Sequence, residues 1–254
     1  MLLSIITITK DDPTGLQRTL KSAQAMRAAG VEQIVVDGSG DPSIARALIE
    51  RNGFVGITLA PRAPSGISAA FNAGLKDARG RWVWFLNGGD AVHENLEVGW
   101  LLSLLEMTGS DVVTGTLHFD GEPSPRSTPP LHYQWPLIAC WISHPATIVR
   151  RQLLVDSGGF DSRWRIAMDY DLWFRILKRN AVMDVLSIPL ARFDVNGLSE
   201  NRRTSKISEG EAATVVLRHS ALLLAGSVWI FLRVVKRLGV AFVQSLLRGR
   251  RRNL

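Results

Sequence analysis

The sequence predicts an α/β fold in which a mostly parallel sheet is flanked by helices, with further amphipathic helices at the C-terminus. Short apolar segments alternate with helical patterns through the first 90 residues, which is typical of βαβ units. The apolar segments are continuous rather than alternating, as in a parallel sheet covered on both faces. The segment after residue 205 is basic and carries apolar residues at helical spacing.

In the first half of the chain the alternation is regular. The predicted strands are 2–9, 33–40, 54–60 and 81–87. The helices between them are expected at 13–28, 41–51 and 65–78. Ligands of such sheets bind beyond the carboxyl ends of the strands, and Asp37 and Asp90 both stand at such ends.

The second half is less regular. A strand is expected at 111–119, followed by a Pro-rich surface loop at 120–130. The segment 144–161 predicts a strand, a short helix and a Gly-Gly turn, and apolar spacing predicts a helix over 168–180. The pattern of 182–195 predicts a hairpin-like pair of strands.

Charge is distributed unevenly along the 254 residues, whose formal net charge is +7. Before Glu200 there are 19 Lys and Arg against 20 Asp and Glu, whereas from Glu200 onward there are 11 against 3. No nucleic-acid-binding motif accompanies the basic segment, so we expect no nucleic-acid partner. The single cysteine, Cys140, excludes an internal disulfide and indicates a reducing, cytoplasmic compartment. The N-terminus lacks the basic region of a secretory signal.

Asp90 follows a buried-strand pattern and two glycines in "WVWFLNGGD", residues 82–90. Mg²⁺ and Mn²⁺ prefer oxygen ligands, and Mg²⁺ commonly takes one or two carboxylates together with phosphate oxygens. Glycines allow a diphosphate to approach the backbone closely. A metal on a diphosphate is therefore one interpretation, and the alternative is that Asp90 caps the next helix.

Six segments in this order resemble the family 2 glycosyltransferases: "SIITITKDD", "IVVDGSGD", "GISAAFNAG", "FLNGGD", "HPATIVRR" and "MDYDLWFRI". The resemblance covers about residues 3–200 and is strongest to bacterial enzymes of exopolysaccharide and lipopolysaccharide synthesis, including the colanic-acid type. It implies a GT-A fold with a Rossmann-like sheet, a nucleotide-diphosphate sugar donor and inversion at the transferred sugar. It also implies a catalytic domain over 1–205, with a nucleotide-sugar half to about 110 and an acceptor half after it.

The resemblance assigns nucleotide-sugar contacts to Thr7, Thr9, Asp37, Arg62, Asn72, Asn87 and Gly88. A carboxylate such as Asp37 can accept a base N–H or a ribose hydroxyl. The sequence departs from the family at Lys10 and Asp11, where an aromatic-Asn pair is usual. Two alternatives stay open: Asp37 caps the turn before Asp41, and Arg62 is a solvated surface side chain.

The resemblance also assigns the metal and the base. "LNGGD" aligns with the family's Asp-x-Asp motif, so Asp90 is the expected ligand of Mn²⁺ or Mg²⁺, with Gly89 in the place of a second acid. Asp169 is the expected base and Asp171 the second choice, about 200° round the same helix. Met168 stands where a further acid is common, and both aspartates could instead favour the helix dipole. His144 matches a position near the acceptor.

The C-terminal segment 206–254 predicts a basic, amphipathic helical appendage. Its polar residues within about 120° of arc at helical spacing are Arg233, Lys236, Arg237, Gln244 and Arg248. A basic stripe beside a broad apolar face suits a helix lying on an anionic membrane, so we expect residues 221–254 to bind the inner face of the cell membrane. The alternative is that this helix docks on the catalytic domain.

Together these features predict a metal-dependent inverting glycosyltransferase. It transfers a sugar from a nucleotide-diphosphate donor to a hydroxyl of a glycan, expected to be lipid-linked, in bacterial surface polysaccharide synthesis. One alternative is a sugar-phosphate nucleotidyltransferase, although the Gly-rich N-terminal phosphate loop of that class is missing from "TITKDD". The other is a degenerate glycosyltransferase-like binding module.

Overall fold

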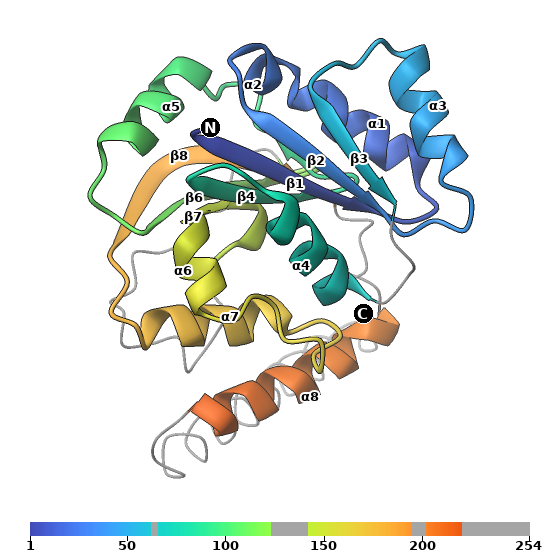
Figure 1. The fold of residues 1–254 in the computed structure, drawn as a ribbon. Coiled ribbons are helices and arrows are strands. Elements are labelled where there is room, and N and C mark those ends of the chain that lie inside the picture. The colour runs from blue at the N-terminus through green and yellow to red at the C-terminus, as the bar shows by residue number, and fades with distance from the viewer. Residues whose placement is uncertain (62–65, 123–141, 195–201, 220–254) are drawn as a thin grey trace, which may run out of the picture.

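The computed structural model describes residues 1–61, 66–122, 142–194 and 202–219, and Figure 1 shows them as a ribbon. An eight-stranded sheet with the order β3-β2-β1-β4-β7-β6-β8-β5 runs through its centre. Two sequence predictions, the contact by Arg62 and the membrane helix in 221–254, lie outside the described residues.

Four parallel strands form the first half of the sheet, as the sequence predicted. They are β1 (Leu3–Thr9), β2 (Glu32–Asp37), β3 (Ile57–Pro61) and β4 (Trp82–Asn87). Apolar side chains fill both faces of these strands, which explains their continuous apolar pattern. The carboxyl ends of all four strands therefore lie at one edge of the sheet.

The second half of the sheet contains β5 (Ala91–Val92), β6 (Val112–Phe119), β7 (Thr147–Arg150) and β8 (Met183–Phe193). Strand β7 is antiparallel to both β4 and β6, and β8 is parallel to β6. Because the direction reverses from β4 to β7 and again from β7 to β6, strands β6 and β8 run parallel to β4. The carboxyl ends of β6 and β8 thus lie at the same edge as those of β1, β2 and β4.

The predicted hairpin at 182–195 is wrong, because the segment forms the single strand β8. Pro189 misled the prediction, since proline seldom occurs within a strand. It lies opposite Thr116, where the β6–β8 register shifts. A Cβ on Gly115 would lie 2.7 Å from the Ile188 carbonyl oxygen, so glycine allows the strands to approach closely at this irregularity. The strand bends past the proline instead of turning back.

Helices cover both faces of the sheet (Figure 1). Those on one face are α1 (Pro13–Ser22), α2 (Gln24–Ala28), α3 (Ser43–Arg51) and α5 (Val98–Met107). Those on the other face are α4 (Ile67–Asp77), α6 (Arg151–Asp156) and α7 (Met168–Leu177). The single helix predicted over 13–28 is interrupted at Ala23, where α1 gives way to α2.

Helix α8 (Arg202–His219) passes through the predicted domain boundary at 205 and lies against the outer side of α7. Val215 and Val216 are fully buried in a cluster with Tyr170 and Phe174 of α7. The described part of the predicted appendage, 206–219, is therefore packed onto the catalytic body. Within the residues that the structure describes, none of the helices has the length and hydropathy that crossing a membrane requires.

Candidate functional site

The carboxyl ends of β1, β2 and β4 bring several predicted residues together. Thr9 is paired with Asp37 across β1 and β2, and the Gly38 N–H donates to the Thr9 carbonyl oxygen at 2.9 Å. The Gly88 N–H donates to the Ile8 carbonyl oxygen at 2.8 Å. A Cβ on Gly88 would lie 3.2 Å from the Thr9 hydroxyl, so glycine leaves room there. These backbone bonds gather Thr9, Asp37 and Gly88 at one place.

Only one of the two carboxylate oxygens of Asp37 has a hydrogen-bond partner among the described residues. The side chain is 1% exposed, and its Oδ1 accepts the Ser39 N–H at 2.9 Å. This bond is the turn-capping role that the sequence left open. Its Oδ2 is buried and has no hydrogen-bond partner among the described residues. A buried polar atom without a partner is costly, so Oδ2 is well suited to accept a hydrogen bond from a ligand.

Asp90 closes the turn after β4 and is 2% exposed. Its Oδ2 accepts the Asn87 N–H at 3.2 Å, and its Oδ1 accepts the Asp194 N–H at 3.3 Å. Burial raises the pKa of Asp90 to about 7, and the neighbouring Asp194 charge acts in the same direction. Glu97, not Asp90, caps α5 by accepting the Trp100 N–H. The helix-cap alternative is therefore excluded.

Asp194, which the sequence analysis missed, lies at the end of β8 beside the Asp90 turn. Gly89 has φ +105°, and a Cβ there would lie 2.8 Å from the Asp194 carboxylate. Glycine is thus required both by its backbone conformation and by the approach of Asp194. The carboxylate that the sequence lacks at Gly89 is supplied in space by Asp194. Its position at a strand end was the available signal, and the wrong hairpin prediction hid it.

These donors fit a divalent cation. Asp90 and Asp194 bring two carboxylates close together, and a cation beside them would favour the ionised form of Asp90, which burial and, to a smaller degree, the Asp194 charge disfavour. Asn87 adds a buried Oδ1 without a hydrogen-bond partner among the described residues. Oxygen donors of this kind are those that Mg²⁺ and Mn²⁺ prefer. No group of three acidic, histidine or cysteine ligands occurs in the described part of the chain, so phosphate oxygens or water must complete the shell.

Thr19 of α1 anchors this turn from the opposite side. Its hydroxyl accepts the Gly89 N–H at 3.0 Å and lies 2.6 Å from the Asp90 carbonyl oxygen, to which it can donate. The side chain is fully buried. The first helix thus fixes the backbone that presents Asp90.

Asp169 lies in the first turn of α7, at the same edge of the sheet. The Ser68 hydroxyl, at the start of α4, contacts the Asp161 and Trp164 carbonyl oxygens at 3.4 and 3.3 Å, which draws the segment before α7 towards that edge. Burial raises the pKa of Asp169 to about 6. A carboxylate with this pKa is charged at neutral pH and still basic enough to accept a proton in a reaction.

The sequence analysis gave Asp171 as the second choice for the base, but its contacts indicate a different role. It is fully buried and pairs with Arg175 through Oδ2 at 2.8 Å and with His219 through Oδ1 at 2.8 Å. Burial opposes ionisation, but the hydrogen bond from His219 and the charge of Arg175 hold the pKa of Asp171 below its ordinary value. Both oxygens have partners, Arg175 within α7 and His219 on α8, so these contacts give Asp171 a structural role.

Two residues predicted to contact the nucleotide instead hold the protein together. Thr7 is fully buried, and its hydroxyl accepts the Gln33 side-chain N–H at 3.2 Å inside the sheet. The Asn72 amide makes a pair of bonds with the backbone of Phe160, accepting its N–H at 2.8 Å and donating to its carbonyl oxygen at 2.7 Å. Asn72 thereby fixes the Gly-Gly turn at 158–159.

His144 lies among aromatic rings, with centroids of Phe71, Phe85, Phe160 and Trp173 at 5.1, 5.5, 5.7 and 6.2 Å. Burial lowers the pKa of His144 to about 4, so the ring is neutral. Both ring nitrogens are buried without a partner among the described residues. The structure gives His144 a packing role, and its contact with an acceptor stays a prediction.

Comparison with known proteins decides the family. The family model described as "Glycosyl transferase family 2" matches residues 4–185. The chain belongs to this family. It is 29% identical over 224 residues to the Mycobacterium tuberculosis protein described as "Uncharacterized glycosyltransferase Rv1514c", covering 81% of this chain and 79% of that one. The sequence prediction of a glycosyltransferase is thus confirmed at the level of the family and its activity class.

Solved structures confirm the GT-A type of fold. The structure of S. aureus TarS residues 1–349 has a TM-score of 0.67 and 20% identity, and covers 86% of this chain. This chain spans 65% of the length of that structure. TarS 1–349 in complex with UDP-GlcNAc gives a TM-score of 0.67 at 20% identity, over 87% of this chain and 68% of that one. The curled sheet flanked by helices is common to both proteins.

The anchoring role of Thr19 predicts the effect of Thr19→Val. This change removes the hydroxyl and keeps the shape, so the buried Gly89 N–H loses its acceptor. We expect the free energy of unfolding in urea to fall by about 1–3 kcal/mol. Thr14→Val, at an exposed position of the same helix, is the matched control and should change it little. Equal effects of the two changes would contradict the anchoring role.

Proposed function

We propose that this glycosyltransferase is a metal-dependent inverting enzyme that transfers a sugar from a nucleotide-diphosphate donor to a glycan hydroxyl. The observation that carries the proposal is a set of acidic side chains: the buried Asp37, whose Oδ2 has no partner among the described residues, the buried Asp90 beside Asp194, and the partly buried Asp169 with a raised pKa. TarS has been solved with UDP and with UDP-GlcNAc, which makes a uridine nucleotide sugar the first donor to test.

In this proposal the nucleoside lies over the ends of β1 and β2. Asp37 accepts a base N–H or ribose hydroxyl through Oδ2, and Thr9 and Gly88 border the diphosphate. Asp90 and Asp194 hold Mn²⁺ or Mg²⁺. When bound, the cation supplies positive charge that offsets the negative charge developing on the departing diphosphate. The residues of the turn hold the donor in place.

Asp169 then acts as the general base. It accepts the proton of the acceptor hydroxyl as that oxygen forms a bond to the anomeric carbon and the bond to the diphosphate breaks. A single displacement of this kind inverts the configuration of the transferred sugar. The two raised pKa values favour an active enzyme over a degenerate binding module, because they belong to buried or partly buried carboxylates that form no ion pair within the described part of the chain. Family membership likewise favours sugar transfer over nucleotidyl transfer.

The acceptor in this proposal is a lipid-linked glycan of a bacterial surface polysaccharide, at the cytoplasmic face of the cell membrane. The support is the basic, amphipathic pattern of residues 221–254 in the sequence. A peripheral enzyme held at this surface would meet such an acceptor there.

The first test is the release of nucleoside diphosphate with Mn²⁺: UDP from UDP-GlcNAc, and the corresponding diphosphate from each member of a panel of other nucleotide sugars. Asp169→Asn should lower kcat by about 100-fold or more while the donor KM changes little, because only the base is lost. Asp90→Ala should raise the Mn²⁺ concentration needed for half-maximal rate. Asp156→Asn, on the exposed side of α6, is the control. Unchanged turnover in both Asp90→Ala and Asp169→Asn would refute the assigned site.

The pH dependence of kcat follows from the raised pKa of Asp169. The base works only when deprotonated, so at saturating Mn²⁺ the rate should be level above about pH 7 and fall below about pH 6. Saturating metal keeps Asp90 ionised and removes its titration from this range. A rate that stays constant down to pH 4.5 would show that Asp169 is not the base.

The membrane proposal predicts the outcome of charge reversal in the full-length protein. Lys236→Glu with Arg237→Glu should weaken binding to phosphatidylglycerol-containing vesicles, measured by co-sedimentation, by at least about tenfold. The reason is that each basic residue near such a surface contributes about 1 kcal/mol to the binding free energy. The control is Arg46→Glu with Arg51→Glu, which makes the same change of charge at exposed positions of α3. Equal binding by the two double variants would contradict a membrane role of residues 221–254.

A further inference from the structure

Glu211 of α8 closes the N-terminus of α7. Its Oε1 accepts the backbone N–H of Arg165 at 2.9 Å, and its Oε2 accepts those of Ile166 and Ala167 at 2.8 and 2.9 Å. Ala167 is the N-cap residue of α7 and provides no side-chain hydrogen bond of its own. A carboxylate here satisfies exposed N–H groups and faces the positive end of the helix dipole. Glu211 thus binds the backbone immediately before α7 and the N–H of its N-cap residue.

The segment that Glu211 holds leads directly into Asp169. Asn72 fixes the beginning of this segment at Phe160, and Ser68 contacts its middle at the Trp164 carbonyl oxygen. Both of these residues belong to α4. Glu211 holds the last three residues before Met168, so α8 determines the position of the backbone closest to the base.

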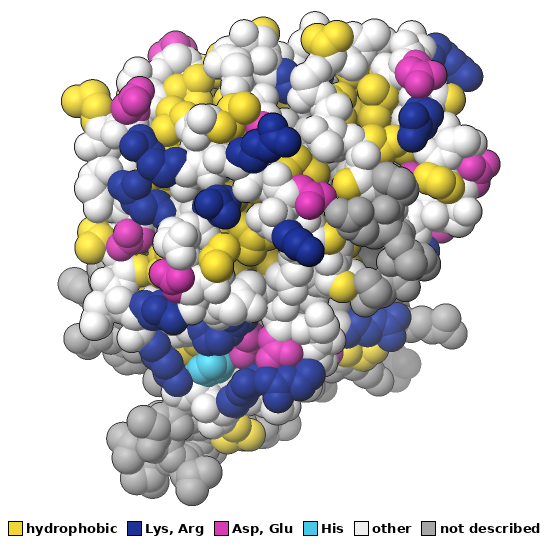
Figure 2. All heavy atoms as spheres, viewed as in Figure 1, with side chains coloured by type: hydrophobic (Ala, Val, Ile, Leu, Met, Phe, Trp, Pro, Cys, Tyr) yellow, Lys and Arg dark blue, Asp and Glu magenta, His cyan; other side chains and the backbone are white. Residues whose placement is uncertain are grey.

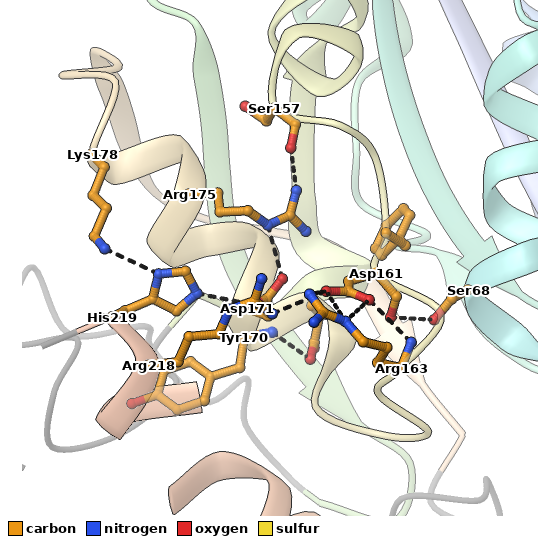
Figure 3. Close-up of polar contacts among 12 residues, drawn as sticks. Ser68, Ser157, Asp161, Arg163, Tyr170, Asp171, Arg175, Lys178, Arg218 and His219 are labelled. Atoms are coloured by element: carbon orange, nitrogen blue, oxygen red, sulfur yellow. Dashed lines mark hydrogen bonds and ion pairs between the residues drawn. The ribbon is translucent and has the colours of Figure 1, made fainter. Parts of the chain in front are cut away.

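Helix α8 is itself held firmly against α7. Glu211, Val215 and His219 follow one another at intervals of four residues and therefore lie on one face of the helix. Val215 is fully buried, and the His219 ring stacks on Phe174 with centroids 5.1 Å apart. His219 also bonds to Asp171 at 2.8 Å, as Figure 3 shows. The anchor of Glu211 is thus rigid.

Ion pairs strengthen the same junction. Arg218 of α8 pairs with Asp161 at 3.0 Å, and Asp161 also pairs with Arg163 at 2.6 Å. The hydrogen bond from Arg163 holds the pKa of Asp161 well below its ordinary value. Figure 2 shows acidic side chains and a histidine among Lys and Arg where α7 meets α8. Charged contacts therefore surround the segment that Glu211 closes.

We propose that Glu211 is a positioning residue for transfer, which fixes the backbone from which Asp169 is presented to the acceptor hydroxyl. The inference rests on the proposed role of Asp169 as base. The Asp169 carboxylate accepts the Tyr170 N–H at 2.7 Å, so its direction follows the first turn of α7. A reacting group displaced by about 1 Å can lower a rate by roughly 100-fold.

Glu211→Gln tests this role. The glutamine keeps the size of the side chain, but its NH₂ group faces backbone N–H donors that the lost oxygen accepted. In the UDP-release assay with UDP-GlcNAc and Mn²⁺, we expect kcat to fall by about 10- to 100-fold. The donor KM should stay within about twofold, because the nucleotide residues lie on β1, β2 and β4. Amide hydrogen exchange over 165–170 should quicken while that of β1 does not.

Thr214→Ala is the matched control, since Thr214 is exposed on the same helix and its hydroxyl donates to the Gly210 carbonyl oxygen of α8. It should leave kcat, donor KM and exchange over 165–170 unchanged. Glu211→Asp is the second variant in case the glutamine protein does not fold. Its shorter side chain should lower kcat less than Glu211→Gln and quicken exchange less.

The outcomes separate this inference from the proposed function. Normal kcat in Glu211→Gln with quickened exchange would overturn the positioning role and leave the proposed function intact. A fall in kcat matched by a rise in donor KM and a lower Tm would show general loss of structure and would also overturn it. If the wild-type protein released no nucleoside diphosphate from any nucleotide sugar in the panel, both would be overturned.

Discussion

The common direction of β1, β2, β4, β6 and β8 is the constraint on which the rest of the structure depends. Because these strands run the same way, the loops that follow them meet at one edge of the sheet. Backbone bonds from Gly38 to Thr9 and from Gly88 to Ile8 hold that edge together. For this reason Asp90 and Asp194 are neighbours and Asp37 lies at the same edge, although the three are far apart in the sequence.

Burial then divides the acidic residues into two kinds. Asp171 is buried with Arg175 and His219, and its pKa lies below the ordinary value, so it stabilises the α7–α8 junction. Asp90 is buried and Asp169 partly buried, neither forms an ion pair with a residue that the structure describes, and their pKa values rise to about 7 and about 6. Keeping a carboxylate in this state costs stability unless a ligand compensates. This contrast is the reason why we propose a structural role for Asp171 and chemical roles for Asp90 and Asp169.

Much of this arrangement could be predicted from the sequence. The apolar strands and the polar residues at their ends were enough to place Asp37 and Asp90 at the edge. Asp194 follows the same rule, but Pro189 suggested a turn where the strand only bends past an irregular register. Thr7 belongs to a family motif, yet the alternation of side chains across the sheet directs it inwards to Gln33.

Other features leave no local pattern in the sequence. Asn72 and Glu211 bind backbone groups of distant segments, at 160 and at 165–167. Because backbone groups are the same in nearly every residue, the residue types at these positions do not reveal the contacts. Only the packing of α8 on α7 shows that Glu211 reaches the start of α7. For the same reason, the boundary predicted at 205 falls inside α8, a helix that packs on α7.

Calorimetric titration of UDP into the wild-type protein and into Asp37→Asn tests most directly whether this edge binds a nucleotide. Asparagine can retain the Oδ1 bond to Ser39 while an NH₂ donor replaces the unpartnered Oδ2. The wild type should bind UDP more tightly with Mn²⁺ than without it, and Asp37→Asn should bind it at least about tenfold more weakly. Equal affinity of the two proteins, with no dependence on Mn²⁺, would contradict a nucleotide site at the ends of β2 and β4.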